Sequence, residues 1–187
     1  MDRKVRSGYT TMELLVVIAI ISILAGFFVY SIMVQVARER LRAATTQLAS
    51  DLNQAKLKSI TTGGIWGIRV CSGSGQYKIF IDHDLNCQDA VSSCTADNTR
   101  VCMNNPTTTC STDANCTGNT GPCVQRERLI PLPSRVLPEG DFYVVFDRRG
   151  YALNFSCGVG ADSVSLRNAF NERRSIFVDS LGRVRYE

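Results

Sequence analysis

Eight cysteines stand out in this sequence of 187 residues, and six of them lie within residues 87–123. These six are separated by 7, 8, 8, 6 and 7 positions, with mostly Thr, Asn, Asp, Ser and Gly between them. Clustered thiols form either disulfides or a metal site. No Cys-x-x-Cys is present and His83 is the only histidine, so the spacing favours disulfides over zinc. The disulfide candidates are Cys71, Cys87, Cys94, Cys102, Cys110, Cys116, Cys123 and Cys157.

The segment 87–123 has little to bury, so we expect covalent cross-links rather than a core of its own. The sequence does not select among the pairings of its six cysteines. Cys71 and Cys157 fall on expected strands and are candidates for a fourth bridge to each other. Disulfides persist in an oxidising compartment, which an exported domain would provide.

The sequence offers few candidate catalytic residues. Asp82-His83-Asp84 offers a metal ligand or a base, but a polar loop is the simpler interpretation. The sequence contains no nucleophile motif and no phosphate-binding glycine loop. The net charge of +4 is too small by itself to indicate nucleic-acid binding. We therefore expect a protein that is not an enzyme and holds no cofactor or metal.

A long apolar segment, Leu14–Val34, contains 21 residues without a charge. About 20 apolar residues span a bilayer core of roughly 30 Å as a helix. Glu13 borders this segment, although a charged carboxylate at a membrane helix end is costly unless it is paired. A simple one-pass anchor with an acid at the interface is the alternative. Basic residues flank the segment equally, so charge does not set its orientation: Arg3, Lys4, Arg6, Arg38, Arg40 and Arg42.

The helical pattern continues beyond the apolar segment. Small and apolar residues recur every three or four positions, and Gly63-Gly64 then ends the helix. The stripe comprises Leu41, Ala44, Leu48, Leu52, Ala55 and Ser59, of which Ser59 is the polar member. One helix over about 12–62 is expected. The transmembrane or filament-core segment is assigned to 9–36, and the amphipathic continuation of the helix to 37–62. Arg38, Arg40 and Arg42 are expected to be solvated near lipid headgroups.

Residues 63–187 are expected to form a globular domain rich in antiparallel β-sheet. Runs of β-branched and aromatic residues predict strands, and Gly, Asp and Asn clusters between them predict turns. The expected strands are 65–71, 76–81, 142–146, 151–157, 163–166, 175–178 and 183–186. The expected turns include 72–75, 147–150, 171–174 and 180–182. Pro131, Pro133 and Pro138 indicate a crossing segment rather than a strand interior. The fold class is therefore α+β, a long N-terminal helix packed on an antiparallel sheet with a disulfide-rich insertion.

The N-terminal sequence SGYTTMELLVVIAII, residues 7–21, resembles the leader and first helix of type IV pilins and type II secretion pseudopilins. The resemblance implies cleavage by a prepilin peptidase after Gly8, which leaves residues 1–8 as the leader. It also implies N-methylation of Tyr9, where the family usually has Phe. Glu13 would then pair with the Tyr9 amine of a neighbouring subunit and set the register of the helices.

Further short motifs narrow the resemblance to the GspH/FimT group of minor pilins and minor pseudopilins. They are Asp51–Lys56, Phe146–Gly150 and Leu181–Arg185. The resemblance implies a subunit that is held in the inner membrane by a single span, with a periplasmic C-terminal domain, until a pilus or pseudopilus incorporates it. Its partners would be the prepilin peptidase, other pilin or pseudopilin subunits, the inner-membrane assembly platform and the membrane itself.

Two alternatives remain for the globular domain. Some members of the group resemble DNA receptors of natural transformation with a C-terminal Gly-Arg-x-Arg, which Gly182-Arg183-Val184-Arg185 matches. In a strand, Arg183 and Arg185 share one face, and guanidinium groups suit phosphate. Against DNA, residues 124–187 are only weakly basic. The second alternative is adhesion through the cysteine-rich insertion.

Overall fold

The computed structural model describes residues 10–82, 84, 86–88, 94–95, 98–118 and 121–187, without the side chain of Phe27. The chain divides into two compact units, Met1–Val36 and Ala37–Glu187. Helix α1, Thr11–Thr62, contributes residues to both units. It begins one residue before the position that the sequence pattern predicts and ends where predicted.

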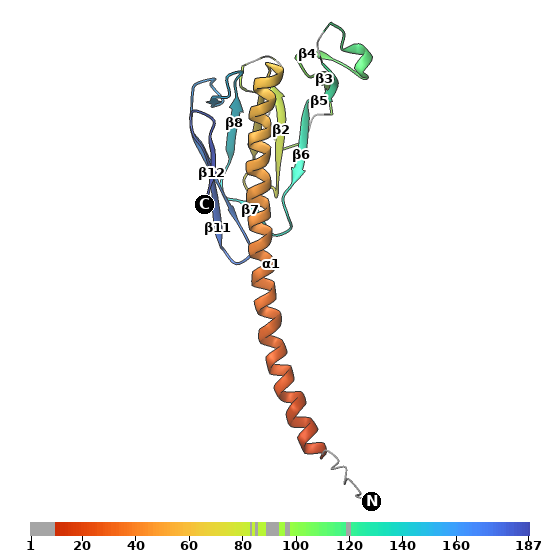
Figure 1. Cartoon of the computed structure of the whole chain (residues 1–187), viewed down its shortest axis with the longest axis vertical. Helices are drawn as coiled ribbons and strands as arrows, with labels where there is room; N and C mark the ends of the chain where they lie inside the picture. The colour runs from red at the N-terminus through yellow and green to blue at the C-terminus, as the bar shows by residue number, and fades with distance from the viewer. Residues whose placement is uncertain (1–9, 83, 85, 89–93, 96–97, 119–120) are drawn as a thin grey trace, which may run out of the picture. The chain divides into compact units, whose positions relative to one another are not determined.

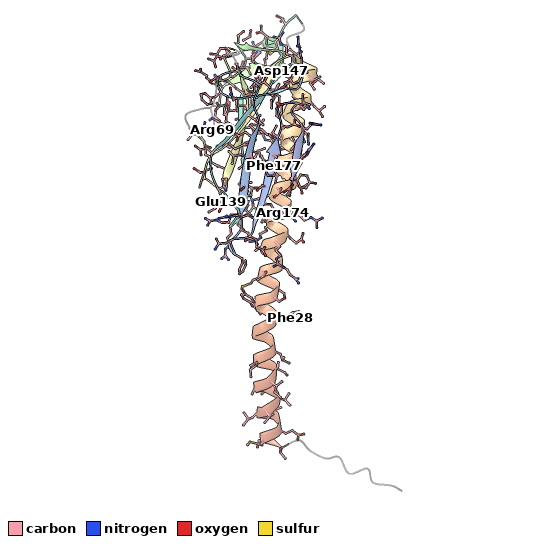
Figure 2. All side chains as sticks on the ribbon, turned by 90° about the vertical axis from the view of Figure 1, so that its left-hand side faces the viewer. Phe28, Arg69, Glu139, Asp147, Arg174 and Phe177 are labelled. Carbon is pink, nitrogen blue, oxygen red and sulfur yellow. A yellow bond between two sulfur atoms is a disulfide. The ribbon has the colours of Figure 1, made fainter. Side chains whose placement is uncertain are left out.

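In the first unit, α1 is apolar and exposed on all described sides. Its apolar side chains include Leu14, Ile18 and Leu24, each more than half exposed, and Phe28, which projects outward in Figure 2. By length and composition the helix is suited to cross a membrane. Apolar surface of this extent is unfavourable in water, so this part of α1 requires lipid or other helices around it.

In the second unit, the rest of α1 packs on two antiparallel sheets (Figure 1). The predicted stripe is confirmed, because all six of its members, Ser59 included, are at most 2 % exposed. Ser59 is accommodated because its hydroxyl donates to the Ala55 carbonyl and accepts from the Trp66 backbone N–H. The polar member of the stripe thus connects the helix to the first strand.

The first sheet has the strand order β6-β2-β1-β8-β9, and the second has the order β12-β11-β10-β7. A common core joins both sheets to the helix, with Leu48 and Leu52 from α1 packed among side chains of β1, β8 and β11. The strands are β1 Ile65–Val70, β2 Gln76–Asp82, β6 Glu127–Pro131, β7 Leu137–Pro138, β8 Phe142–Phe146, β9 Ala152–Leu153, β10 Asp162–Arg167, β11 Arg173–Val178 and β12 Val184–Tyr186. The predicted α+β class is therefore confirmed.

A smaller core lies on the face of the first sheet that points away from α1. Phe80, Val145 and Cys87 are fully buried there. A Cβ on Gly67 would lie 2.4 Å from Phe80 and 2.5 Å from Val145, so the glycine makes room for both side chains. Beside this core, the Nζ of Lys78 lies 3.2 Å from the Oε2 of Glu127, with both side chains buried.

The insertion contains three short strands that the sequence pattern did not predict. It forms a third sheet of order β4-β3-β5, from β3 Arg100–Cys102, β4 Asn105–Thr109 and β5 Cys123–Gln125. Val101 belongs to the main core, and Cys102 and Cys123 are buried. The expectation of covalent cross-links rather than a core of its own is confirmed, because two disulfides lie within the insertion and Val101 packs into the main core.

The proline-rich segment also departs from its prediction. Pro131 ends β6 and Pro138 lies within the two-residue strand β7. Both strands are at sheet edges, where a missing backbone N–H costs no ladder hydrogen bond. The strand predicted over 151–157 shortens to β9, because Asn154 begins a turn instead.

Candidate functional site

The start of α1 carries Glu13, the residue predicted to act in assembly. Thr10 caps the helix, with its Oγ1 accepting from the Glu13 backbone N–H at 3.3 Å. Thr10 and Glu13 have the Thr-x-x-Glu spacing of a capping box, and the contact with Thr10 is one half of it. The Glu13 side chain therefore lies in the first turn, where the helix dipole favours a negative charge. Gly8 and Tyr9, the predicted processing residues, and His83 lie outside the described residues.

The arginines after the apolar segment contact the globular domain. The Nε of Arg38 donates to Glu172 at 2.6 Å, and Arg40 donates to the Ser134 hydroxyl at 3.0 Å. Asn168 also donates to Glu172, at 3.0 Å. Arg38 and Arg40 are exposed, as expected for a solvated face, but their contacts with the domain were not predicted, because sequence position alone does not reveal the loops that reach them. Arg42 is exposed.

One turn geometry occurs four times in the C-terminal part of the domain. In each copy an Asp or Asn side-chain oxygen accepts from the backbone N–H groups two and four residues later, and the third following residue has a positive φ. The side chain therefore replaces backbone partners in the turn. The four turns are 147–151, 154–158, 168–172 and 179–183. Their positive-φ residues are Gly150, Cys157, Asn171 and Gly182.

Two of these turns meet at α1. A Cβ on Gly182 would lie 2.1 Å from the Gly150 carbonyl oxygen, and a Cβ on Gly150 would lie 2.8 Å from the Lys56 Cε. Lys56 donates from its Nζ to the carbonyls of Leu181 and Gly182, at 3.1 and 2.9 Å. We call the residues Lys56, Gly150, Leu181 and Gly182 the turn junction. It tethers the segment between β11 and β12 to the helix.

The turn junction contains residues from all three motifs that resemble the GspH/FimT group. Lys56 ends the helical motif, Gly150 ends the Asp-Arg-Arg-Gly motif, and Leu181-Gly182 begins the C-terminal motif. Three motifs that lie far apart in the sequence are thus explained by one packing arrangement. This arrangement is structural: close backbone approach requires glycine, and the turn carbonyls require a donor.

Arg183 and Arg185, predicted as DNA contacts, line one surface hollow of about 350 Å³ on the second sheet. Phe177 lies opposite Arg185 in the strand register and is 42 % exposed (Figure 2). Asp179 and Glu187 line the same hollow, and the Nε of Arg183 is 2.6 Å from the Asp179 Oδ2. Hydrogen bonds from the Arg183 backbone and guanidinium lower the pKa of Asp179. The hollow therefore carries both signs of charge.

All eight cysteines are paired. Each of the two cysteines outside the insertion pairs with a cysteine inside it, so the suggested bridge between Cys71 and Cys157 was wrong. The four disulfides are Cys71–Cys94, Cys87–Cys157, Cys102–Cys116 and Cys110–Cys123. Two bridges stabilise the third sheet and its loop, and two attach Cys94 and Cys87 to the main domain. Cys102, Cys110 and Cys116 bring their sulfurs within 4.8 Å, but all three sulfurs are in disulfides rather than thiolates that bind metal.

The chain matches no protein-family model and no curated protein. Among solved structures it is similar to the type IV minor pilin FimU of Pseudomonas aeruginosa, with 10 % identity and a TM-score of 0.49 over 80 % of this chain and 90 % of that one. It is also similar to the minor pseudopilin EpsH of the Type 2 Secretion System of Vibrio cholerae. That similarity has 8 % identity and a TM-score of 0.45 over 79 % of this chain and 96 % of that one.

Proposed function

We propose that this chain is a minor pilin or minor pseudopilin, a structural subunit of a type IV pilus or of a type II secretion pseudopilus. The observation that supports the proposal is that the two halves of α1 differ in which side chains are exposed. Most of the described side chains in residues 11–36 are apolar and exposed, whereas residues 37–62 contribute a stripe of buried side chains to a folded domain. A helix of this kind holds a subunit first in a bilayer and then among other helices, while its domain decorates the filament.

In this proposal, a prepilin peptidase cleaves after Gly8 and the new N-terminal residue, Tyr9, is methylated. The free amine of Tyr9 is cationic near neutral pH and pairs with Glu13 of a neighbouring subunit. Unpaired, a carboxylate would be costly in the apolar interior of a filament, so the pair selects one axial register. The inner-membrane assembly platform would supply the work of extracting the helix from lipid. The domain would face the periplasm, where the four disulfides are stable.

The DNA-binding alternative has one supporting observation: Arg183 and Arg185 line the same hollow beside an exposed aromatic ring. The acidic side chains of Asp179 and Glu187 in that hollow offset the two guanidinium charges, which weakens attraction to phosphate. A structural subunit therefore agrees better with the geometry. Titration of the full chain with duplex DNA at several salt concentrations distinguishes the two. Salt-sensitive binding that is lost when both arginines become Ala would support DNA uptake.

The subunit proposal is tested by incorporation into filaments. The full-length chain, its Glu13→Gln variant and its Glu39→Gln variant are each expressed in a strain that lacks the native gene. Sheared filaments, or pseudopili after overexpression of the secretion system, are then probed for the chain. We expect wild-type and Glu39→Gln chains in the filament fraction and at least a tenfold lower amount of the Glu13→Gln chain. Equal amounts of all three chains would contradict the role of Glu13. Absence of the wild-type chain would contradict the subunit role.

A further inference from the structure

A second polar site lies away from the helix start and the turn junction. It is a cleft of about 420 Å³ lined by α1, the edge strand β6 and Met103 of the insertion. Asp51, Gln54 and Lys58 recur at helical spacing along one wall, and Arg126, Arg128 and Ile130 alternate along the other. Trp66, Ile79 and Met103 also line it. Figure 1 shows β2 and β6 beside α1, with the β4-β3-β5 sheet near the end of the helix.

The cleft is predominantly cationic. Burial and the nearby Arg128 guanidinium lower the pKa of Lys58, which the Asp51 carboxylate raises in turn. Asp51 is the one carboxylate among the lining residues, and it already accepts a hydrogen bond from the buried Tyr77 hydroxyl. Within the described part of the chain, no carboxylate lies within ion-pair distance of Lys58 or Arg128. Lys58 and Arg128 therefore face one hollow whose single lining carboxylate, Asp51, lies beyond ion-pair distance of both.

The aromatic floor orients the lysine. The Nζ of Lys58 lies 4.5 Å from the centre of the Trp66 ring, and the indole N–H donates to Thr62 at 3.2 Å. A cation–π contact occupies one side of the ammonium group, so the Lys58 donors on its other sides remain available to a ligand in the cleft that the residue lines. Gln54 and Gln125 add amide donors to the lining. Convergent donors of this kind, with a cation on each wall, suit a compact anion.

We propose that this cleft binds an anionic group, a carboxylate or a phosphate, between Lys58 and Arg128. The source of the group is either a free anion or an acidic side chain of a partner, and both present the same chemistry to the cleft. An anion there would relieve the repulsion between the two cations. It would also connect α1 to β6 beside the disulfide-bonded insertion, which gives the insertion a role in shaping a binding site.

The test uses the fluorescence of Trp66, the only tryptophan in the chain. The full-length protein in neutral detergent micelles is titrated with sodium phosphate and, separately, with sodium succinate. Sodium chloride keeps the ionic strength constant in both titrations. We expect a saturable change in Trp66 emission with at least one of the two anions. Saturation with phosphate alone, or with succinate alone, identifies which anion the cleft prefers.

Arg128→Gln is the critical variant, because it removes one cation without altering the contact between Lys58 and Trp66. It is expected to raise the Kd at least tenfold. Arg42→Gln, on an exposed helix position outside the cleft, is the matched control and should bind as wild type does. Emission that changes linearly with both anions, or saturable binding that Arg128→Gln leaves unchanged, would overturn the proposal. Neither result bears on filament incorporation, so the two proposals fail independently.

Discussion

Gly182 lies so close to the backbone carbonyl of Gly150 that position 182 has no space for a side chain. A Cβ on Gly182 would come within 2.1 Å of the Gly150 carbonyl oxygen. Both residues have positive φ angles, 67° and 82°, and both end an Asp-x-x-Gly turn of the same hydrogen-bonding pattern. The contact joins two turns that are distant in sequence and places them against Lys56 of α1. The position of β12, and with it of Arg183 and Arg185, depends on this contact.

Replacing Gly182 by Ala should strongly destabilise the domain. The substitution adds both the backbone cost of a positive φ and a steric overlap with the Gly150 carbonyl, so we expect a loss of about 2–4 kcal/mol in the free energy of unfolding. Gly73→Ala is the matched control, because Gly73 has φ 72° but nothing within 4 Å of an added Cβ. It should cost only about 1 kcal/mol. Denaturant unfolding in micelles measures both, and equal losses would contradict the account of the contact.

Lys56→Met should also loosen the turn junction. The substitution keeps the aliphatic stem and removes the donor to the Leu181 and Gly182 carbonyls. We expect a loss of about 1–3 kcal/mol, typical of removing a charged donor from partly buried acceptors. Arg42→Met removes a long cation from an exposed position of the same helix and should be nearly neutral. Thermal unfolding provides the comparison, and a neutral Lys56→Met would show that the carbonyls are satisfied without it.

Acid should weaken the domain through Asp179. Its pKa is lowered in the folded protein, chiefly by the Arg183 backbone N–H and then by the Arg183 guanidinium. The stabilisation is therefore present above the unfolded-state pKa of about 3.9 and is lost as the pH falls through the lower folded-state pKa. Asp179→Asn should keep the turn, because Asn154 and Asn168 accept the same hydrogen bonds in the equivalent turns.

The measurement for this prediction is the unfolding temperature between pH 6 and pH 2 for the wild type and Asp179→Asn. The wild-type temperature should fall more steeply below about pH 4 than that of the variant. Parallel curves would mean that ionisation of Asp179 contributes nothing to stability.

The disulfide pairing can be checked by peptide mapping without reduction. Alkylation of the oxidised protein should find no free thiol, and the linked peptides should join Cys71 to Cys94 and Cys87 to Cys157. Removing the Cys87–Cys157 bridge, which spans 70 residues, should cost more than removing the Cys102–Cys116 bridge, which spans 14. Loop-closure entropy gives about 4 and about 3 kcal/mol, respectively. A peptide that links Cys71 to Cys157 would contradict the structure.

The helix and the main strands could be predicted from the sequence because their signals are local. The stripe from Leu41 to Ser59 has helical period, and the runs at 65–71 and 142–146 have the residues of buried strands. The turns at 147–150 and 180–182 were predicted from Asp and Gly. The sequence does not reveal that these two turns touch each other and Lys56, because that contact is set by how the sheets pack on the helix.

The insertion was harder to predict for a related reason. Its third sheet forms from short strands in a polar segment, and Val101 is the one large buried aliphatic side chain among the residues of the insertion that the structure describes. Such strands depend on long-range pairing and on disulfides rather than on periodicity. The pairing of Cys71 and Cys157 was mispredicted because strand position alone does not say which loop lies above each cysteine. The ion pair between Arg38 and Glu172 escaped notice for the same reason.

The most direct test of the central claim is the mature N-terminus. The full chain is co-expressed with a prepilin peptidase, purified from membranes and analysed by intact mass and N-terminal peptide mapping, with Gly8→Val as the uncleavable control. For the wild type we expect a chain that begins at N-methylated Tyr9 and spans residues 9–187. For Gly8→Val we expect an unprocessed chain. An N-terminus at Met1, or cleavage within or after the apolar segment, would contradict the assignment as a pilin or pseudopilin subunit.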